Sequence, residues 1–495
     1  MKSHFTTFLI LGGILLVLPL TVFLVHQQQD IRQRAQISSQ PTKTAQSPPV
    51  RTSAAAQPFL YGVFEDANHA PAPQSFLSDV KAHNMDTVVF TNNATFDYPQ
   101  SNRTSDESYL TAADGLGMHI IFAPHWELTR DWYGQPEDIT TIRNRVYPIV
   151  DKLKNHRSLL AYNILDDADH VYKNKLAQVT QSFSERDPTI EGLPMLIQGH
   201  EDVYTNRPTD VLITYVYPVL RPYPYCDFSS SAGDGLSYLQ RLRVWTSLAN
   251  GKPIWLVGQV HGSSPIYDPK ASWDQLRTPN NAELRIQHWL AIGEGFKGVF
   301  WFIYGTQQWW TGLADNPTLY AEAANLGVRT SPFRNLLGQL TKTNDMFTIT
   351  GGGNPYVSTL HHPDGRNFAV AVNQTCSSQT VSVNSSLNGK LRDLETDQTY
   401  NLGQSISLQA GDGKIFELVT GNPPPTVTPT STFLPEDIDR NGCVGILDFN
   451  AWFQAVKGTP QPNTFPDVNK DGIVDILDFN LWFRAMKNLP PDKLC

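Results

Sequence analysis

The stretch Leu159-Leu-Ala-Tyr-Asn-Ile-Leu165, followed directly by Asp166-Asp-Ala-Asp169, shows the pattern that decides the fold of the central region. A short, almost continuous apolar run that ends in polar residues is typical of a strand buried on both faces of a parallel sheet. Similar runs lie before and after it, which makes eight predicted strands. The other seven are Phe59–Phe64, Thr87–Thr91, His119–Ala123, Met195–Gln198, Val211–Tyr217, Ile254–Val260 and Gly298–Tyr304.

Longer segments with a helical spacing of apolar residues separate these strands. The clearest are Gln74–His83, Ile142–Lys154, Lys173–Arg186 and Ala282–Glu294. Eight strands that alternate with helices over residues 58–345 predict an α/β fold of the (β/α)8, or TIM-barrel, type. A doubly wound open sheet is the competing topology, but the strand count and the length of the region favour the barrel.

The pattern changes after about Met346, where short strand-like runs are separated by turns rich in Gly, Asn and Asp. We expect a small all-β unit, a β-sandwich over residues 346–420, with a structural role. Its predicted strands include Phe368–Val372, Thr380–Val383, Ser405–Leu408 and Lys414–Leu418.

The N-terminal segment predicts a membrane anchor and a spacer. Lys2 precedes an apolar run from Phe8 to Val25, which suits a short membrane span or a long signal-peptide core. No small-x-small cleavage site follows, so we expect residues 1–26 to be an uncleaved signal anchor; cleavage would make the protein secreted. Residues 27–57, rich in Gln, Ser, Thr and Pro, predict a flexible stalk, and the Pro/Thr-rich residues 421–434 predict a stiffer linker.

The composition narrows the range of partners. The formal net charge of the 495 residues is -9, and the sequence contains no Lys/Arg block. This excludes a basic nucleic-acid-binding surface. Aromatic residues make up 11% of the chain, and their flat faces suit sugar rings although they also fill cores. The N-terminal segment predicts a membrane-anchored, extracytoplasmic protein at the cell surface.

Two segments near the C-terminus repeat each other at an offset of 30 residues, from Asp437 to Asp448 and from Asp467 to Asp478. Each has oxygen donors at loop positions 1, 3, 5 and 12 and a glycine at position 6, and each continues into an apolar helix-like segment. A calcium ion needs about seven oxygens in this arrangement, including the backbone carbonyl at position 7. The expected ligands of two calcium ions are Asp437, Asp439, Asn441, Cys443 and Asp448, and Asp467, Asn469, Asp471, Ile473, Asp475 and Asp478.

The two repeats differ from EF-hands, because Pro435 and Pro466 stand just before the loops and Asp closes them. Residues 435–490 instead resemble the dockerin family, whose two loop–helix units pack together and dock onto a cohesin domain. The resemblance implies an all-α loop–helix pair over residues 435–495, with a cohesin-domain protein as a possible partner. Gly445 replaces the position-9 ligand of the first loop, so water is expected there. We also hypothesise a disulfide between Cys443 and Cys495.

Polar and aromatic residues follow the predicted barrel strands at their C-terminal ends, where the active sites of (β/α)8 barrels lie. Carboxylates, amides and aromatic rings that converge on one rim predict a cleft for a glycan substrate, with no cofactor in the barrel. The predicted substrate-binding residues are Asn92, His125, Trp126, Tyr215, Tyr217, Gln259, His261, Trp301, Tyr304, Trp309 and Trp310.

The segment His156–Asp169 resembles the fourth strand of the glycoside-hydrolase-like barrels that include the retaining β-glycosidases, in which a glutamate is the general acid. The segments Asp210–Pro218, Lys252–Gln259 and Gly295–Tyr304 are similar to their sixth, seventh and eighth strands. The resemblance spans residues 58–340 and implies hydrolysis of O-glycosidic bonds in a polysaccharide or oligosaccharide. Asp167 would then be the general acid, with a shorter side chain than glutamate.

The resemblance breaks at the nucleophile, because Gln259 stands at that position and cannot attack. A second carboxylate would have to come from elsewhere, and Glu127 and Glu65 are the main candidates, with Asp66 as another. The alternatives are a catalytically inactive, glycan-binding barrel, which Gln259 favours, and a surface-assembly protein whose calcium module matters most.

Overall fold

The computed structural model places most of the barrel region, the following β-region and parts of the C-terminal repeats. The described residues are 57–66, 71–91, 106–123, 133–168, 172–189, 191–196, 203–204, 209–231, 235–263, 275–306, 310–420, 436–438, 444–458, 464, 466–468 and 474–488. They fall into two compact units. One contains the residues up to Leu284 together with Phe296–Gly338, and the other contains Arg285–Gly295 and the residues from Gln339 onward.

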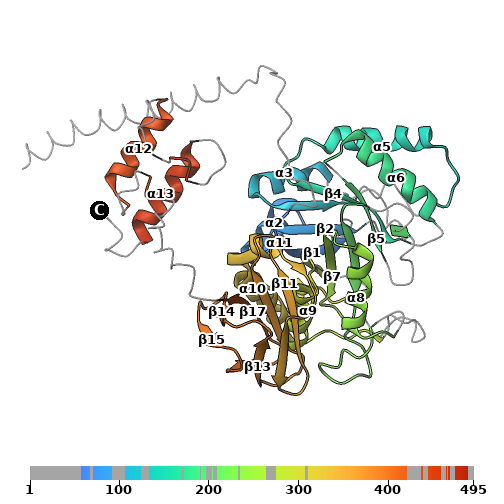
Figure 1. Ribbon diagram of the computed structural model, residues 1–495. Helices are drawn as coiled ribbons and strands as arrows, with labels where there is room; N and C mark the ends of the chain where they lie inside the picture. Colours follow the sequence, from blue (N-terminus) through green and yellow to red (C-terminus); the bar gives the residue numbers. More distant parts are fainter. Residues whose placement is uncertain are drawn as a thin grey trace, which may run out of the picture. The chain divides into compact units, whose positions relative to one another are not determined.

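Eight parallel strands close into a barrel in chain order, and β1 pairs with both β2 and β8 (Figure 1). The predicted (β/α)8 fold is confirmed, and most strands lie within two or three residues of their predicted bounds. The exception is β5, which begins four residues before the predicted start at Met195. The strands are β1 (Leu60–Asp66), β2 (Thr87–Thr91), β3 (His119–Phe122), β4 (Leu159–Ala168), β5 (Glu191–Leu196), β6 (Leu212–Val216), β7 (Ile254–Gln259) and β8 (Gly298–Phe302).

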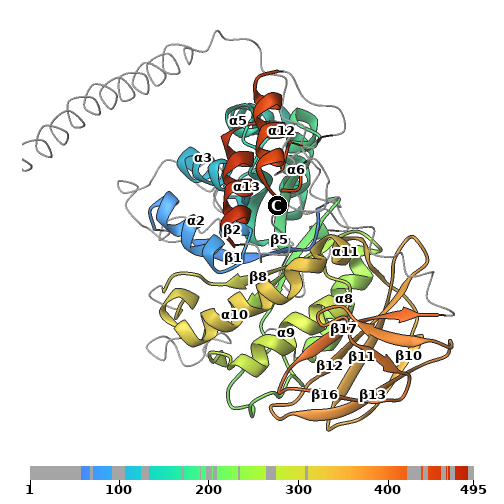
Figure 2. The same ribbon diagram turned by 90° about the vertical axis from the view of Figure 1, so that its left-hand side faces the viewer.

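Helices follow most of the barrel strands. Figures 1 and 2 show α5 and α6 side by side, where Arg143 of α5 donates two hydrogen bonds of 2.8 Å to Glu185 of α6. The helices of this region are α2 (Pro73–Ala82), α3 (Asp106–Leu116), α5 (Ile139–Leu153), α6 (Lys173–Arg186), α8 (Tyr238–Ala249), α9 (Asn281–Gly293), η5 (Leu313–Asp315), α10 (Pro317–Thr330), η6 (Ser331–Phe333) and α11 (Arg334–Gln339).

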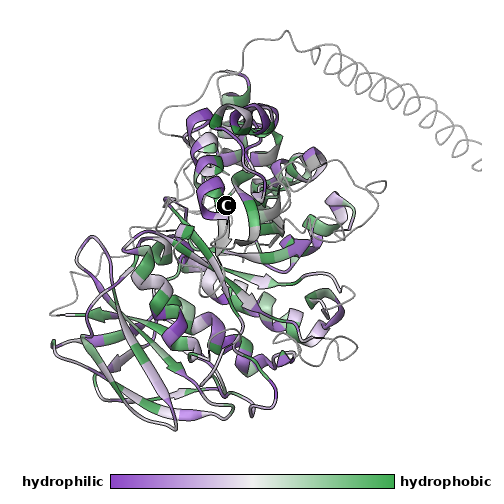
Figure 3. Cartoon of the chain, turned by 90° about the vertical axis from the view of Figure 1, so that its right-hand side faces the viewer, coloured by the Kyte–Doolittle hydropathy of each residue, from purple (hydrophilic) through white to green (hydrophobic). Residues whose placement is uncertain are grey.

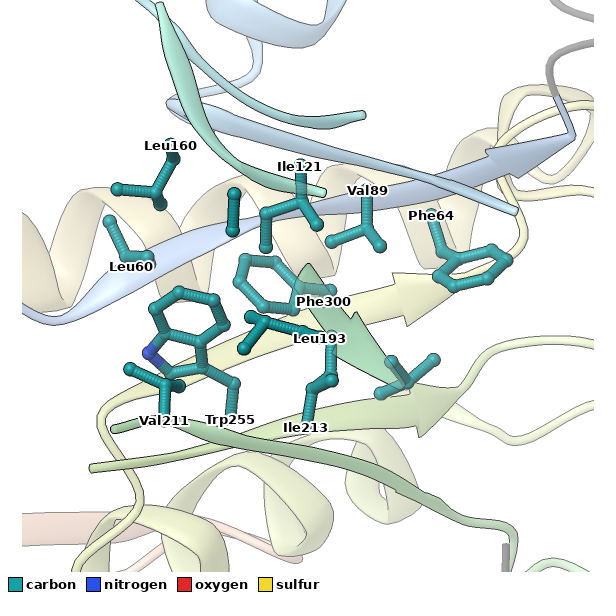
Figure 4. Packing of buried hydrophobic residues seen from close by; sticks show 12 residues of the cluster. Leu60, Phe64, Val89, Ile121, Leu160, Leu193, Val211, Ile213, Trp255 and Phe300 are labelled. Atoms are coloured by element: carbon teal, nitrogen blue, oxygen red, sulfur yellow. The ribbon is translucent and has the colours of Figure 1, made fainter. Parts of the chain in front are cut away.

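The interior of the barrel is packed with apolar side chains from all eight strands. In Figure 4, these side chains point toward a common centre, with Trp255 and Phe300 among the largest. Their rings meet edge to face, with centroids 6.0 Å apart. Side chains alternate between the two faces of a strand, so the positions two residues beyond this core lie on the same inner face at the C-terminal rim. The cluster consists of Leu60, Phe64, Val89, Ile121, Leu160, Ala161, Leu193, Val211, Ile213, Trp255, Val257 and Phe300.

Two antiparallel sheets, of three and six strands, make up the following β-region. Side chains of both sheets share one apolar cluster, which includes Phe347, Val383 and Phe416, so the sheets form a sandwich. Their orders are β10-β13-β16 and β15-β14-β17-β12-β11-β9. The strands are β9 (Thr341–Lys342), β10 (Phe347–Gly351), β11 (Pro355–His361), β12 (Asn367–Asn373), β13 (Gln379–Ser385), β14 (Lys390–Asp393), β15 (Thr399–Asn401), β16 (Ser405–Leu408) and β17 (Gly413–Val419).

The C-terminal repeats contain the helices α12 (Ile446–Val456) and α13 (Ile476–Asn488). They share an apolar cluster in which Phe479 lies 5.1 Å from Trp452 between ring centroids. Figure 3 shows hydrophobic and hydrophilic residues interspersed along the helices of the chain, as amphipathic helices require.

Within the described ranges, no helix is both apolar enough and long enough to cross a bilayer. The segment predicted to do so, Phe8–Val25, lies outside them, as do the stalk and the Pro/Thr linker.

Gly62 lies close to the backbone of Thr87 in β2, and it offers a test of barrel closure. A Cβ atom at this position would lie 1.7 Å from the carbonyl oxygen of Thr87. We expect Gly62→Ala to lower the free energy of unfolding by about 3 kcal/mol, because the strands must separate to admit the methyl group. Thermal unfolding of the full chain, followed by circular dichroism, measures the change.

Gly115 in α3 provides the matched control, because a Cβ atom there meets nothing within 4 Å. Gly115→Ala should leave the unfolding temperature unchanged or raise it, since alanine favours a helix by about 1 kcal/mol over glycine. Equal unfolding temperatures for Gly62→Ala and the unmodified chain would contradict the close approach of β1 and β2.

Candidate functional site

Four aromatic side chains gather at the C-terminal ends of β6 and β8. Tyr215 and Phe302 cover the top of the barrel core, and Tyr217 stacks on Tyr215 with ring centroids 5.0 Å apart. Trp310, which follows β8, contacts Phe302 edge to face at 6.0 Å. All four side chains are partly exposed. Aromatic rings that are half-buried on a barrel rim suit the apolar faces of sugar rings. We call these four residues the aromatic cluster.

His261 is fully buried at the centre of the aromatic cluster. Its ring lies 4.9 Å from those of Tyr217 and Phe302 and 4.6 Å from that of Trp310. The Nδ1 atom is 2.9 Å from the carbonyl oxygen of Phe302. A carbonyl oxygen can only accept, so Nδ1 carries the proton and Nε2 is left as an acceptor. In the part of the chain that the structure describes, Nε2 has no hydrogen-bond partner.

Burial lowers the pKa of His261 from 6.5 to about 4, and the hydrogen bond to Phe302 opposes this only partly. The imidazole is therefore neutral near pH 7. A neutral, buried ring packs among the aromatic side chains of the cluster without placing a charge between them.

Gln259, at the end of β7, is committed to backbone contacts. Its Oε1 atom accepts the N–H of Val219 at 2.8 Å. Its Nε2 atom lies 3.0 Å from the carbonyl oxygens of Val219 and Arg277 and 3.1 Å from that of His261. The side chain thus joins the loops that follow β6 and β7. This position does not fit the substrate contact predicted for Gln259, because its polar atoms already have protein partners.

Glu65 and Asp66 end β1 but lie on opposite faces of it. Glu65 is fully buried, and its two carboxylate oxygens accept the N–H groups of Asp66 at 2.7 Å and of Gly305 at 2.6 Å. These bonds favour an anchoring role for Glu65, which holds the loop after β8, over the predicted catalytic role. Asp66 lies two residues beyond Phe64 and therefore on the inner face. Asp66 is also buried, with 3% of its surface exposed, at the C-terminal end of the strand.

The backbone of Asp167 lies in the last residues of β4, at the same rim as Asp66. Earlier in β4, Asn163 is fully buried and its side-chain amide donates to the carbonyl oxygen of Phe90 at 2.9 Å. The remaining predicted rim residues, Asn92, His125, Trp126, Glu127 and Trp309, lie outside the described residues.

Trp301 and Tyr304 do not take the sugar-stacking positions predicted for them. Trp301 is fully buried, and its indole N–H donates to the hydroxyl of Tyr61 at 2.7 Å. Tyr304 is nearly buried, and its hydroxyl donates to Asp79 of α2 at 2.9 Å. Burial, and then the hydrogen bond to Asp79, raise the pKa of Tyr304 well above its usual value. Neither ring has an open face on which a sugar could stack.

Two residues of the site were not predicted from sequence. Phe302 follows Trp301 directly and occupies the inner face that Trp301 does not. Asn163 is the one amide in the otherwise apolar run Leu159–Leu165, and this polar residue in a buried strand is the sequence feature that could have pointed to it.

A second candidate site lies in the C-terminal repeats, where the closing aspartates Asp448 and Asp478 are fully buried. Asp448 accepts the N–H of Gly445 at 2.6 Å. Asp478 accepts the N–H groups of Val468 and Asp475, both at 2.8 Å, so one carboxylate joins both ends of its loop. Carboxylate oxygens have further lone pairs, and this geometry fits a loop that closes around a hard cation.

The second loop is also bonded to the helix of the first repeat, because the indole N–H of Trp452 donates to the carbonyl oxygen of Asp475 at 2.9 Å. The described part of the loops contains no group of three or more His, Cys, Asp or Glu side chains arranged for a metal. Five predicted ligands lie outside the described residues, namely Asp439, Asn441, Cys443, Asn469 and Asp471, and so does the backbone ligand Ile473. Asp437 and Asp467 begin the two loops within the described part.

No family model matches the chain, and no curated protein matches it in sequence. Solved structures with a similar fold include a catalytic mutant of a GH42 β-galactosidase from G. stearothermophilus, which is 8% identical. The match covers 74% of this chain and 99% of that chain, with a TM-score of 0.51. A GH27 β-L-arabinopyranosidase from Geobacillus stearothermophilus is 10% identical over 74% of this chain and 97% of that chain, with a TM-score of 0.46. At 8% identity, the similarity to the GH42 structure supports the barrel fold alone.

The buried His261 should make stability fall with acidification. Its pKa in the folded chain, about 4, is below the 6.5 of a free histidine, so protons bind preferentially to the unfolded chain between these values. Its contribution is complete above about pH 6.5 and is lost as the pH falls, by about 2 kcal/mol at pH 5. His261→Asn retains an N–H for Phe302 but does not titrate.

We therefore expect the difference in free energy of unfolding between the unmodified chain and His261→Asn to shrink by about 2 kcal/mol from pH 8 to pH 5. Urea denaturation at both pH values measures it. A difference that is the same at both pH values would show that His261 titrates normally and is not buried as described.

Proposed function

We propose that this protein is a glycoside hydrolase that acts on O-glycosidic bonds of a polysaccharide or oligosaccharide. The aromatic cluster around the neutral His261 carries the proposal. It gathers half-exposed rings at the C-terminal rim of the barrel, where Asp66 and Asp167 lie in the last residues of β1 and β4. Sugars present apolar ring faces, which the half-exposed aromatic rings of this surface complement.

The proposed chemistry uses Asp167 as the proton donor to the leaving oxygen. Asp66, on the inner face of β1, replaces Glu65 as the second carboxylate, because Glu65 is held by two backbone N–H groups. The second carboxylate either attacks the anomeric carbon or activates a water molecule, according to its separation from the donor. The structurally similar GH42 enzyme is a β-galactosidase, and this supports glycan hydrolysis at the level of the fold.

A glycan-binding barrel without catalysis is the second candidate, and Gln259 favours it. The four hydrogen bonds of Gln259 show that the rim position expected for a nucleophile serves to hold two loops together. Such a barrel would keep the aromatic cluster and lack turnover.

Asp167→Asn distinguishes the two candidates. An amide of the same size cannot donate a proton to the leaving oxygen, so release of reducing sugar from a panel of galactan, xylan and cellulose should fall by at least about 100-fold. Binding of the same glycans, measured by affinity electrophoresis, should be retained.

Asp151→Asn is a suitable control, because Asp151 pairs with Arg186 on the helix layer away from the rim. It should leave glycan hydrolysis unchanged. An unmodified chain that binds glycans without releasing sugar would refute the hydrolase and support the binding barrel.

For the C-terminal repeats, we propose a dockerin-like module that binds two calcium ions and docks onto a cohesin-domain protein. The buried closing aspartates support the calcium sites, since Asp478 joins both ends of its loop and Asp448 accepts the N–H of Gly445 in the first loop. Phe453 and Phe483 occupy equivalent places in the two helices and are both exposed, as a docking surface requires.

An extracytoplasmic location, with residues 1–26 as the anchor, completes the proposal. Neither Cys226 nor Cys376 is a free thiol, since each takes part in a disulfide, and disulfides are typical of proteins in oxidising compartments. The pairing hypothesised for Cys443 and Cys495 lies outside the described residues and remains part of this proposal.

Each calcium loop should lose its ion independently. Asp437→Ala and Asp467→Ala remove the first ligand of the first and second loop, and each should reduce calcium uptake from two ions to one in isothermal titration calorimetry. The double variant should take up none.

Asp210→Ala is the control, because the Asp210 side chain is 74% exposed and belongs to the barrel unit. It should bind calcium like the unmodified chain. Uptake that persists in the double variant would refute the loop assignment.

A further inference from the structure

Two exposed tyrosines lie on the loop that leads from the aromatic cluster to α8. Tyr223 is 38% exposed and Tyr225 is 67% exposed. Among the described residues of the barrel unit, these are the aromatic side chains with the largest exposure. The loop begins directly after Tyr217, so it is continuous with the proposed glycan site. Exposed aromatic rings next to a proposed ligand site are commonly part of the binding surface.

The backbone of this loop is held at several points, which gives the tyrosines a fixed place. Besides its bonds to Gln259, Val219 accepts the N–H of Arg277 at 3.1 Å. The N–H of Arg221 donates to Gln275, and that of Cys226 donates to the buried carboxylate of Glu283 at 2.8 Å. A loop ordered before binding loses little entropy when a ligand arrives.

Arg277 supports the ring of Tyr225 from one side. The guanidinium carbon lies 4.5 Å from the ring centroid. Arg277 also donates to both carboxylate oxygens of Glu283, with one bond of 2.7 Å, and to the carbonyl oxygen of Pro224 at 3.2 Å. The guanidinium is therefore fixed and its charge is balanced by Glu283. One face of Tyr225 rests on this ion pair, and the large exposed fraction of the side chain leaves the rest of the ring open to solvent.

We propose that Tyr223 and Tyr225 form an outer binding platform for sugar units of an extended, uncharged polysaccharide that reaches beyond the aromatic cluster. The inference rests on the proposed glycan-binding function. It specifies the substrate as a glycan chain long enough to contact both the aromatic cluster and the two tyrosines. Charge balance at Arg277 favours an uncharged glycan over an anionic one. A rigid ring with an open apolar face suits stacking on a sugar, whereas protein partners usually require a larger apolar area.

The test compares long and short oligosaccharides on the full chain carrying Asp167→Asn, which prevents hydrolysis during the measurement. The probes are disaccharides and hexasaccharides of galactan, xylan and cellulose, with affinity measured by isothermal titration calorimetry. Tyr225→Ala should weaken hexasaccharide binding by about five-fold, and Tyr223→Ala by a similar or smaller factor. Disaccharide binding should not change. Tyr225→Trp should retain the hexasaccharide affinity, because the flat face remains.

Tyr147→Ala is the matched control. Tyr147 is a partly exposed tyrosine on α5 with the guanidinium of Arg186 5.3 Å from its ring centroid, in the helix layer between α5 and α6. It should bind both oligosaccharides like the background chain. Equal loss of disaccharide and hexasaccharide affinity in Tyr225→Ala would show a structural role and overturn the platform.

Two other outcomes separate this inference from the proposed function. Hexasaccharide binding that is unchanged in the Tyr223→Ala/Tyr225→Ala double variant would overturn the platform and leave the glycan site intact. Absence of binding to every oligosaccharide by the background chain, together with absence of hydrolysis by the unmodified chain, would overturn both.

Discussion

Closure of the parallel sheet is the constraint on which the barrel unit depends. A strand at the edge of a sheet leaves its N–H and C=O groups unpaired, and β1 avoids this by pairing with β2 on one side and β8 on the other. Closure requires a close approach between strands, which Gly62 permits at its contact with Thr87. It also directs all eight C-terminal ends to one rim, so side chains distant in the sequence meet there.

The sequence predicts the barrel well because a strand buried on both faces must be apolar throughout. The prediction is weakest at β5, whose residues Glu191-Gly-Leu-Pro194 contain two residues that disfavour strands. The packing explains the glycine: a Cβ atom on Gly192 would lie 2.8 Å from the ring of Phe183 on α6. The need for that space arises from a tertiary contact, and local propensity does not reveal it.

The site was harder to predict than the fold, because residue type does not reveal direction. Trp301 and Phe302 are adjacent aromatic residues at one strand end, yet one packs against Tyr61 outside the barrel and the other faces the aromatic cluster. A shift of one residue in the inferred register exchanges the two roles. Similarly, the role of Gln259 depends on Val219, which is 40 residues away in the chain.

Those bonds also limit how this barrel can evolve. A nucleophile at the end of β7 is one substitution away in the sequence, since Gln259→Glu changes only an amide to a carboxylate. In this structure, the amide N–H₂ of Gln259 faces three carbonyl oxygens. A carboxylate oxygen in its place has no hydrogen to donate, so the three carbonyl oxygens would repel it. Acquiring the nucleophile would therefore release the loop that carries Tyr223 and Tyr225, so a lineage that gained this chemistry would have to rebuild the loop as well.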